Sequence, residues 1–169
     1  MNALSLTIFT YLFVMSGSIF ADTLSADQLA KIKSIGEVLD KFHEAAATGD
    51  WVTYFNLMSD DAVFIGTDAS ERWTKPVFKA YAGNTTGWVY SPKTRNINLT
   101  PSGVSAWFDE ILISKNYGTS RGTGILIHSD AGWKISQYHL TFPIPNALAS
   151  QITEEIKRFE SEGARNQKP

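Results

Sequence analysis

The order of the predicted elements indicates an α+β domain in which helices cover one face of an antiparallel sheet. Apolar residues at helical spacing come first, between Leu29 and Ala46, and two shorter helical segments follow them. A run of strand-like segments then extends to Phe142, and Pro143-Ile-Pro145 ends it. Helices that precede a continuous run of strands pack together on that sheet, which is the α+β arrangement.

Composition limits the chain to one domain and excludes several classes of partner. The 169 residues suffice for one sizeable core. The net charge is -2 and the Lys and Arg residues are scattered, so we expect no nucleic-acid partner. There is no Cys, which excludes disulfides and a lipoprotein anchor. The domain must therefore be held together by its core alone.

The first 21 residues have the composition of a secretory signal peptide. They carry no acidic or basic side chain, and a mostly apolar stretch from Leu6 to Met15 precedes small residues that end at Ala21. Ser and Thr interrupt the apolar stretch too often for a stable membrane anchor. We expect cleavage after Ala21 and a periplasmic or secreted domain at 22–162, followed by a frayed tail at 163–169.

Capping residues locate the first two helices. Ser25 and Gln28 form a capping box, and apolar residues at helical spacing continue from there to Ala46. Asp50 can cap a second, short helix that runs to Leu57. These two helices should pack their apolar sides on the sheet.

Two later helices and six strands complete the predicted element order. Thr74 with Pro76 opens a third helix. Asn146 caps a last helix, with apolar residues in register as far as Phe159. The strands are predicted at 62–66, 88–90, 95–99, 104–114, 120–128 and 133–142.

The last two strands form a hairpin with polar residues on one face. A three-residue loop at Asp130-Ala131-Gly132 pairs Thr123 with His139 and Ile125 with Gln137, and sets Arg121 on the same face. A half-buried sheet face tolerates polar groups when they are paired or meet a ligand. We therefore predict ligand contacts from Arg121, Thr123, Gln137 and His139. A slip of one residue would place Gly122 and Gly124 on that face instead.

Two adjacent acids interrupt the long strand at 104–114. Neighbouring residues of a strand point to opposite faces, so either Asp109 or Glu110 faces the helices. The inward acid needs a partner, and Arg121 on the next strand is the candidate. The pair is either a structural ion pair or, with His139, part of a catalytic site. The chain has three His residues without ligand spacing, so we expect no metal and no cofactor.

Five segments together resemble the nuclear transport factor 2-like superfamily, in its SnoaL-like branch, and the resemblance extends from about Leu29 to Leu148. The segments are Phe64-Ile-Gly-Thr-Asp68, Glu71-Arg-Trp73, Ala106-Trp-Phe-Asp-Glu110, Arg121-Gly-Thr-Gly-Ile-Leu126 and Trp133-Lys-Ile-Ser-Gln-Tyr138. The resemblance implies a cone-shaped, cystatin-like domain, in which a curved antiparallel sheet wraps three N-terminal helices and a C-terminal helix follows. It also implies a pocket that contains His139, with Glu71 and Trp73 at its rim.

Three functional hypotheses remain. The first is an exported domain that binds a small, partly apolar organic ligand with an acidic or carbonyl group; Arg121 would pair with the ligand, and Trp73 and Trp107 would form an apolar wall. The second is an isomerase or cyclase, with Asp109 or Glu110 as the base and His139 as the acid. The third is a homodimer that pairs through an outward surface formed by Tyr138, Leu140 and Phe142.

Overall fold

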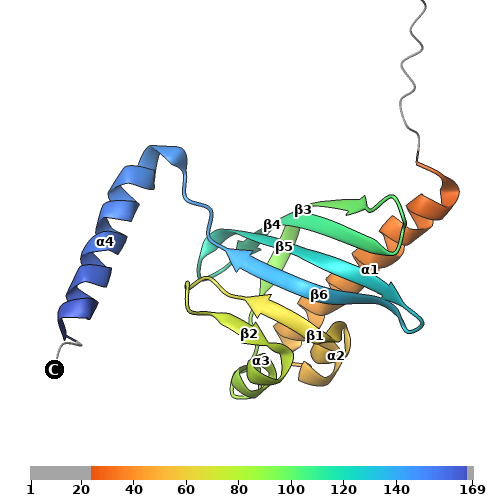
Figure 1. Cartoon of the computed structure of the whole chain (residues 1–169), viewed down its shortest axis with the longest axis horizontal. Helices are drawn as coiled ribbons and strands as arrows, with labels where there is room; N and C mark the ends of the chain where they lie inside the picture. The colour runs from red at the N-terminus through yellow and green to blue at the C-terminus, as the bar shows by residue number, and fades with distance from the viewer. Residues whose placement is uncertain (1–23, 167–169) are drawn as a thin grey trace, which may run out of the picture.

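The computed structural model describes residues 24–166 and shows four α-helices and one six-stranded sheet in that range (Figure 1). The signal peptide expected at 1–21 lies outside the described residues and stays a prediction. The elements in chain order are α1 (Ala26–Thr48), α2 (Trp51–Asn56), β1 (Met58–Ile65), β2 (Arg72–Thr74), α3 (Lys75–Ala82), β3 (Tyr90–Leu99), β4 (Ser105–Ser114), β5 (Gly118–Ser129), β6 (Gly132–Thr141), the 3-10 turn η1 (Asn146–Leu148) and α4 (Ala149–Asn166).

The first three helices start where the sequence predicted, whereas Asn146, predicted to cap the last helix, begins the 3-10 turn η1 and forms no side-chain cap. The Ser25 side chain accepts a hydrogen bond from the Gln28 backbone and the Gln28 side chain accepts one from the Ser25 backbone, which is the capping box expected from the sequence. Asp50 accepts a hydrogen bond from the Thr53 backbone N–H and so caps α2. Thr74 precedes α3 without a side-chain cap, and Pro76 lies in the first turn.

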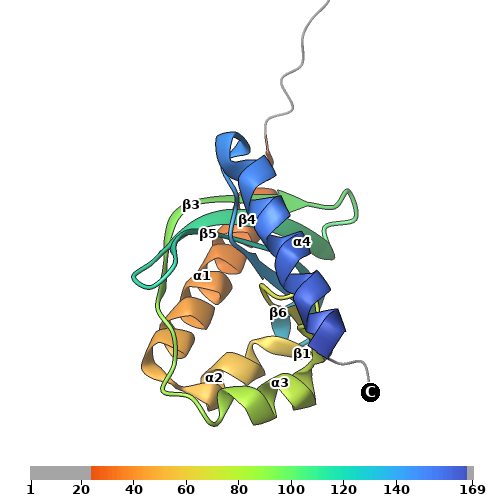
Figure 2. The same ribbon diagram turned by 90° about the vertical axis from the view of Figure 1, so that its left-hand side faces the viewer.

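The predicted fold class is confirmed, with one parallel strand pair. The strand order is β2-β1-β6-β5-β4-β3, and β1 runs parallel to β6 while every other neighbouring pair is antiparallel. The sheet curves over α1, α2 and α3, which together cover its inner face (Figure 2). The short strand Arg72–Thr74 was not among the predicted strands, and it adds an edge beside β1. The two strands predicted at 88–90 and 95–99 are replaced by the single strand β3.

The core lies between the inner face of the sheet and the three N-terminal helices. Along each strand, inner residues alternate with outer ones. In β4, for example, the inner residues Ala106, Phe108 and Glu110 are all buried. Large aromatic rings fill the space under the helices. The buried aromatic residues are Phe42, Tyr54, Phe55, Phe64, Phe78, Phe108, Trp133 and Tyr138.

One close approach in the core requires a glycine. Gly122 of β5 lies opposite Glu110 of β4. A Cβ added at Gly122 would collide with the Tyr138 hydroxyl and lie 2.9 Å from a Glu110 carboxylate oxygen. The missing side chain therefore makes the space in which Tyr138 of β6 reaches Glu110.

The C-terminal helix stands away from the sheet. Helix α4 packs against η1, and Figure 1 shows it on the far side of the linker that follows β6. Its apolar residues Ile156 and Phe159 are exposed. The helix extends to Asn166, into the tail expected at 163–169, and it contains Gly163, which a helix tolerates. Among residues 24–166 no helix is long and apolar enough to cross a membrane.

Candidate functional site: an aromatic pocket

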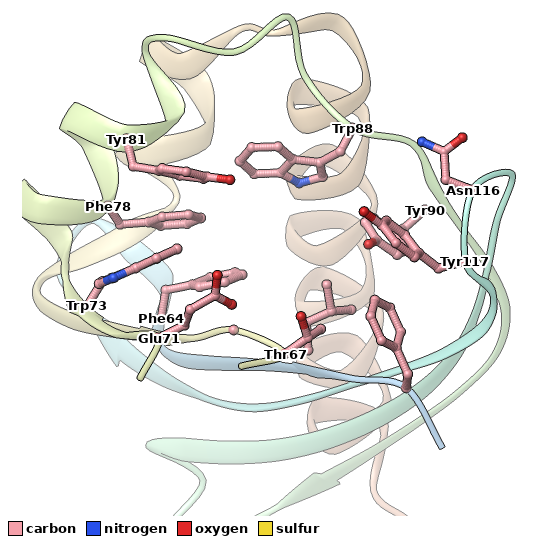
Figure 3. A pocket seen from close by; sticks show the side chains of 13 residues that line it. Phe64, Thr67, Glu71, Trp73, Phe78, Tyr81, Trp88, Tyr90, Asn116 and Tyr117 are labelled. Carbon is pink, nitrogen blue, oxygen red and sulfur yellow. The ribbon is translucent and has the colours of Figure 1, made fainter. Parts of the chain in front are cut away.

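A pocket of about 370 Å³ opens at the end of the sheet where β1, β2 and α3 meet the end of β6 (Figure 3). Aromatic side chains dominate its lining. We refer to it as the aromatic pocket. It is lined by Phe64, Gly66, Thr67, Glu71, Trp73, Phe78, Tyr81, Trp88, Tyr90, Asn116, Tyr117, Leu140 and Phe142.

One wall of the aromatic pocket is a column of nearly parallel rings. The rings of Phe64 and Phe78 lie 3.9 Å apart between centroids, and Trp73 stacks on Phe78 at 5.4 Å. Tyr81 continues the column at 4.8 Å from Trp73. These residues come from β1, β2 and α3, so the short strand β2 is what brings Trp73 into line with the helix. Aromatic pairs in such arrangements stabilise one another, so the rings are held together as one wall.

The opposite side of the aromatic pocket comes from distant parts of the chain. Tyr117 lies in the turn between β4 and β5, and its ring stacks on that of Phe142 at 4.8 Å. Trp88 lies in the loop before β3 and Tyr90 begins that strand; the Trp88 backbone N–H donates a hydrogen bond to the Ala46 carbonyl near the end of α1. This bond fixes the segment that carries Trp88. Figure 3 shows the two sides facing each other across the cavity.

Glu71 is the charged residue of the pocket lining. Its backbone pairs with Gly66, whose N–H donates to the Glu71 carbonyl at 2.8 Å. The Asp68 backbone N–H donates to a Glu71 carboxylate oxygen at 3.2 Å. A Cβ at Gly66 would lie 2.9 Å from the Glu71 Cβ and collide with its carboxylate. Gly66 therefore makes room for the Glu71 side chain to enter the cavity, as Figure 3 shows.

A second carboxylate, that of Glu110, lies on the inner face of the sheet but is completely enclosed. One of its oxygens lies 2.6 Å from His43 Nε2 and accepts a hydrogen bond from the Tyr138 hydroxyl at 3.0 Å. Its other oxygen accepts from Arg95 Nε at 2.8 Å, and Arg95 also pairs with Asp40 at 2.7 Å. We call these five residues the Glu110 network.

The neighbouring charges determine which groups of the Glu110 network carry a proton. Burial by itself raises the pKa of Glu110, but the hydrogen bond and charge of His43 and the charge of Arg95 outweigh it, so the pKa lies below its usual value of 4.5. Burial and the neighbouring Glu110 charge raise the pKa of Tyr138 well above 10.0. Glu110 is therefore an ionised, fully paired group, and Tyr138 is a neutral hydrogen-bond donor to it.

The structure resolves which of the two adjacent acids faces the helices, and it corrects the predicted partner. Glu110 is inward and 0% exposed, whereas Asp109 faces outward and accepts a hydrogen bond from the Asn96 side chain at 2.9 Å. The partner of Glu110 is Arg95 on the preceding strand, where the two residues are directly opposite. Arg121 is not the partner, because it lies opposite Ile111 and on the outer face.

The last hairpin has the predicted pairs but the opposite orientation. Thr123 pairs with His139, and Ile125 pairs with Gln137, as the sequence indicated. The loop is shorter than predicted, since Ser129 lies opposite Gly132, and a bulge at Ser136 restores the register beyond it.

The polar face of this hairpin is the outer face of the sheet, not the pocket side. Tyr138 and Gly122 point toward the helices, so their neighbours His139, Arg121 and Thr123 point away from them. The expectation that these polar side chains share an enclosed hollow is therefore wrong. Water can solvate these polar side chains on the outer face. On the inner face, a side chain at position 122 would collide with Tyr138, so a glycine is required there.

The predicted site residues divide among the pocket, the buried core, which contains Glu110, and the outer face. Glu71 and Trp73 line the aromatic pocket. Trp107 is 49% exposed on the outer face, and it forms no wall of the pocket. The remaining predicted residues outside the pocket lining are Asp109, Glu110, Arg121, Thr123, Gln137 and His139.

Sequence patterns did not predict several of the pocket residues. Tyr81, Trp88, Tyr90 and Tyr117 have no shared periodicity, because they come from a helix end, a loop, a strand start and a turn. The one available signal was the concentration of aromatic residues between Trp73 and Tyr90. Within residues 24–166 no group of three or more His, Cys, Asp or Glu side chains is placed to hold a metal ion.

Comparison with known proteins supports the fold and names the family. A search of the curated proteins finds no relative. Similar solved structures include a candidate aromatic ring hydroxylase from Novosphingobium aromaticivorans, with 16% identity, a TM-score of 0.60, and coverage of 69% of this chain and 92% of that one.

Two further structures agree. A nuclear transport factor 2-like protein of unknown function from Pseudomonas putida has 15% identity, a TM-score of 0.59, and coverage of 70% of this chain and 90% of that one. A candidate dehydratase of the nuclear transport factor 2-like family from Streptomyces avermitilis has 14% identity, a TM-score of 0.58, and coverage of 69% and 98%. The SnoaL-like domain family matches residues 35–145, which is well over half of the chain, and this protein therefore belongs to that family.

Proposed function

We propose that this SnoaL-like domain binds a small, partly apolar organic molecule in the aromatic pocket. The observation that carries the proposal is a cavity of about 370 Å³ with aromatic side chains on two facing sides. This volume lies within the range of small-molecule sites, which are mostly apolar and contain a few polar groups. Here the polar groups are Glu71, Thr67 and Asn116, together with the hydroxyls of the tyrosines.

The exposure of the pocket rings supports binding. Tyr81 is 51% exposed and Tyr117 is 62% exposed, although each ring is stacked on another aromatic side chain. Apolar surface that a ligand covers contributes roughly 25 cal/mol per Å² to binding. A flat apolar ligand between the two sides would remove much of this ring surface from water.

The ligand expected from the sequence had an acidic or carbonyl group that paired with Arg121. Arg121 does not line the aromatic pocket. An acidic group on the ligand would therefore find no cationic side chain in the pocket lining. The ligand proposed here is partly apolar, like the one expected from the sequence, but has no acidic group.

Calorimetric titration with a neutral probe, 2-naphthylmethanol, tests the proposal. We expect Tyr81→Ala and Tyr117→Ala to weaken binding at least several-fold, because each removes ring surface from the pocket. Trp107→Ala is the matched control, since Trp107 is an exposed aromatic residue on the outer face. Equal weakening by all three variants, or no binding by the unaltered protein, would contradict the proposal.

The alternative function is acid-base catalysis next to a carbonyl, as in an isomerase or cyclase. Two structurally similar proteins are named as a candidate hydroxylase and a candidate dehydratase, and at 16% and 14% identity they show the shared fold alone. Neither Asp109 nor His139 lines the aromatic pocket. A base in this pocket would have to be Glu71, and a catalysed reaction would then be abolished by Glu71→Gln while binding persists.

A further inference from the structure

We infer that the ligand of the aromatic pocket carries a positively charged amino group, which pairs with the Glu71 carboxylate. This inference rests on the proposed function, since it names the chemical class of the molecule that the pocket binds. It reverses the ligand charge expected from the sequence.

The charges around the cavity support the inference. No Lys, Arg or His side chain lines the aromatic pocket, so Glu71 gives the lining a negative charge without a counterion. Within residues 24–166 the Glu71 carboxylate forms no ion pair. Its one hydrogen bond there comes from the Asp68 backbone N–H, which leaves acceptor positions free on both oxygens.

The strand geometry keeps the nearest cation out of the pocket. Glu71 and Trp73 are two residues apart and both line the cavity, whereas Arg72 between them is exposed and lies opposite Ile65. The chain thus presents the acid and the indole inward and the guanidinium outward. A pocket that binds an anion would favour the opposite arrangement, with the Arg72 guanidinium inside and the Glu71 carboxylate outside.

Electrostatics then selects among ligands. A carboxylate near apolar ring surface interacts more strongly with a charge than it would in bulk water, because the surroundings screen less. An ammonium group on the ligand would gain a charge-assisted hydrogen bond from its N–H to Glu71. The ring of Trp88 lies across the cavity from Glu71 (Figure 3), and indole faces also attract cations. An anionic ligand would instead be repelled.

Three probes that share the naphthyl ring test the charge preference by calorimetric titration: 2-naphthylmethylamine, which is cationic at pH 7, neutral 2-naphthylmethanol and anionic 2-naphthoate. We expect the unaltered protein to bind the amine about tenfold more tightly than the alcohol, and the acid most weakly. Added salt should weaken the binding of the amine and leave that of the alcohol unchanged.

The variant Glu71→Gln keeps the size of the side chain and an oxygen that can accept the Asp68 hydrogen bond. We expect it to lose the preference for the amine, so that the amine and the alcohol bind with equal affinity. Glu37→Gln is the control, because Glu37 is an exposed acid on α1. It should leave the preference intact.

The possible results separate the inference from the proposed function. If the alcohol binds and the amine has no advantage, or if Glu71→Gln keeps that advantage, the inference is overturned and the proposed function stands. If none of the three probes binds the unaltered protein, both are overturned. Should Glu71→Gln fail to fold, the amine-to-alcohol ratio and its salt dependence in the unaltered protein decide the matter.

Discussion

Two glutamates, Glu110 in the core and Glu71 in the pocket lining, have completely different surroundings. Glu110 is fully enclosed and its two oxygens are held by His43, Arg95 and Tyr138. Glu71 opens into the aromatic pocket and accepts a single backbone hydrogen bond within the described residues. A paired, enclosed carboxylate stabilises the fold, whereas an unpaired carboxylate beside a cavity can bind a ligand. The partners of each acid, rather than its residue type, therefore indicate its role.

The largest expected effect is the loss of stability on removing Glu110. Glu110→Ala would remove one ion-pair partner of the buried Arg95 guanidinium and the hydrogen-bond partner of the buried His43 ring, and breaking a buried pair in this way costs about 3–5 kcal/mol. Urea unfolding measures the difference. Asp109→Ala is the neighbouring control and should change the unfolding free energy by less than about 1 kcal/mol. Equal effects of the two variants would remove the distinction between the inner and outer acids.

The next effect concerns the space in which Tyr138 meets Glu110. Gly122→Ala adds a methyl group that collides with the Tyr138 hydroxyl, and overpacking of this kind costs about 1–3 kcal/mol. We expect Tyr138→Phe to recover part of this loss when the two changes are combined. As a control, Gly36→Ala on α1 meets only Ile97 at 3.9 Å and should be neutral or slightly stabilising. A fully stable Gly122→Ala protein would contradict the close approach.

A smaller effect should appear as a dependence of stability on pH. The folded pKa of Glu110 lies below its usual value of 4.5, so its ionised form stabilises the fold fully above about pH 4.5. This contribution is lost as the pH falls below 4.5 toward the folded pKa. Unfolding free energies measured between pH 6 and pH 3 should therefore fall more steeply for the unaltered protein than for Glu110→Gln. Parallel curves for the two proteins would show that Glu110 does not titrate in this way.

The smallest effect on the pocket is expected from changes on the outer face of the sheet. Tyr138, Leu140 and Phe142, which the sequence offered as a dimer surface, face the core or the pocket. The predicted homodimer would have to use exposed apolar residues such as Trp107 and Ile125 instead.

Light scattering on the Trp107→Asp variant tests whether a homodimer forms through the outer face. A dimer that uses the outer face should dissociate while the affinity for 2-naphthylmethanol stays unchanged. A dimer that survives the change must use another surface.

The sequence predicted the fold class, the first three helices and the last hairpin, because apolar spacing, capping residues and turn residues are local signals; it missed the short strand β2 and divided β3 into two strands. It also predicted the pairing of Thr123 with His139. No local signal indicates which side of that hairpin meets the helices, because alternation separates two faces without saying which one is inner. The feature that decides it is the packing of Tyr138 over Gly122.

The sequence also could not predict the partner of Glu110 or the aromatic pocket. Arg95 meets Glu110 through the register of β3 with β4, which contains a bulge between Pro92 and Thr94. The residues of the pocket come from loops and element ends, and the folded arrangement alone brings Tyr117 opposite Trp73. Glu71 and Trp73 were found through the family resemblance, since their charge and size carry no positional information.

The parallel pairing of β1 with β6 has a consequence for how the chain acquires its fold. Met58 meets Ile135 and Phe64 meets Tyr138, so an early strand lacks its main neighbour until the final strand has been synthesised. A nascent chain that ends before Gly132 has β1 with an open hydrogen-bonding edge and uncovered aromatic rings, which are features that promote aggregation. Such long-range pairing also slows folding. Truncations from the C-terminal side that reach into β6 should therefore yield insoluble fragments rather than smaller domains.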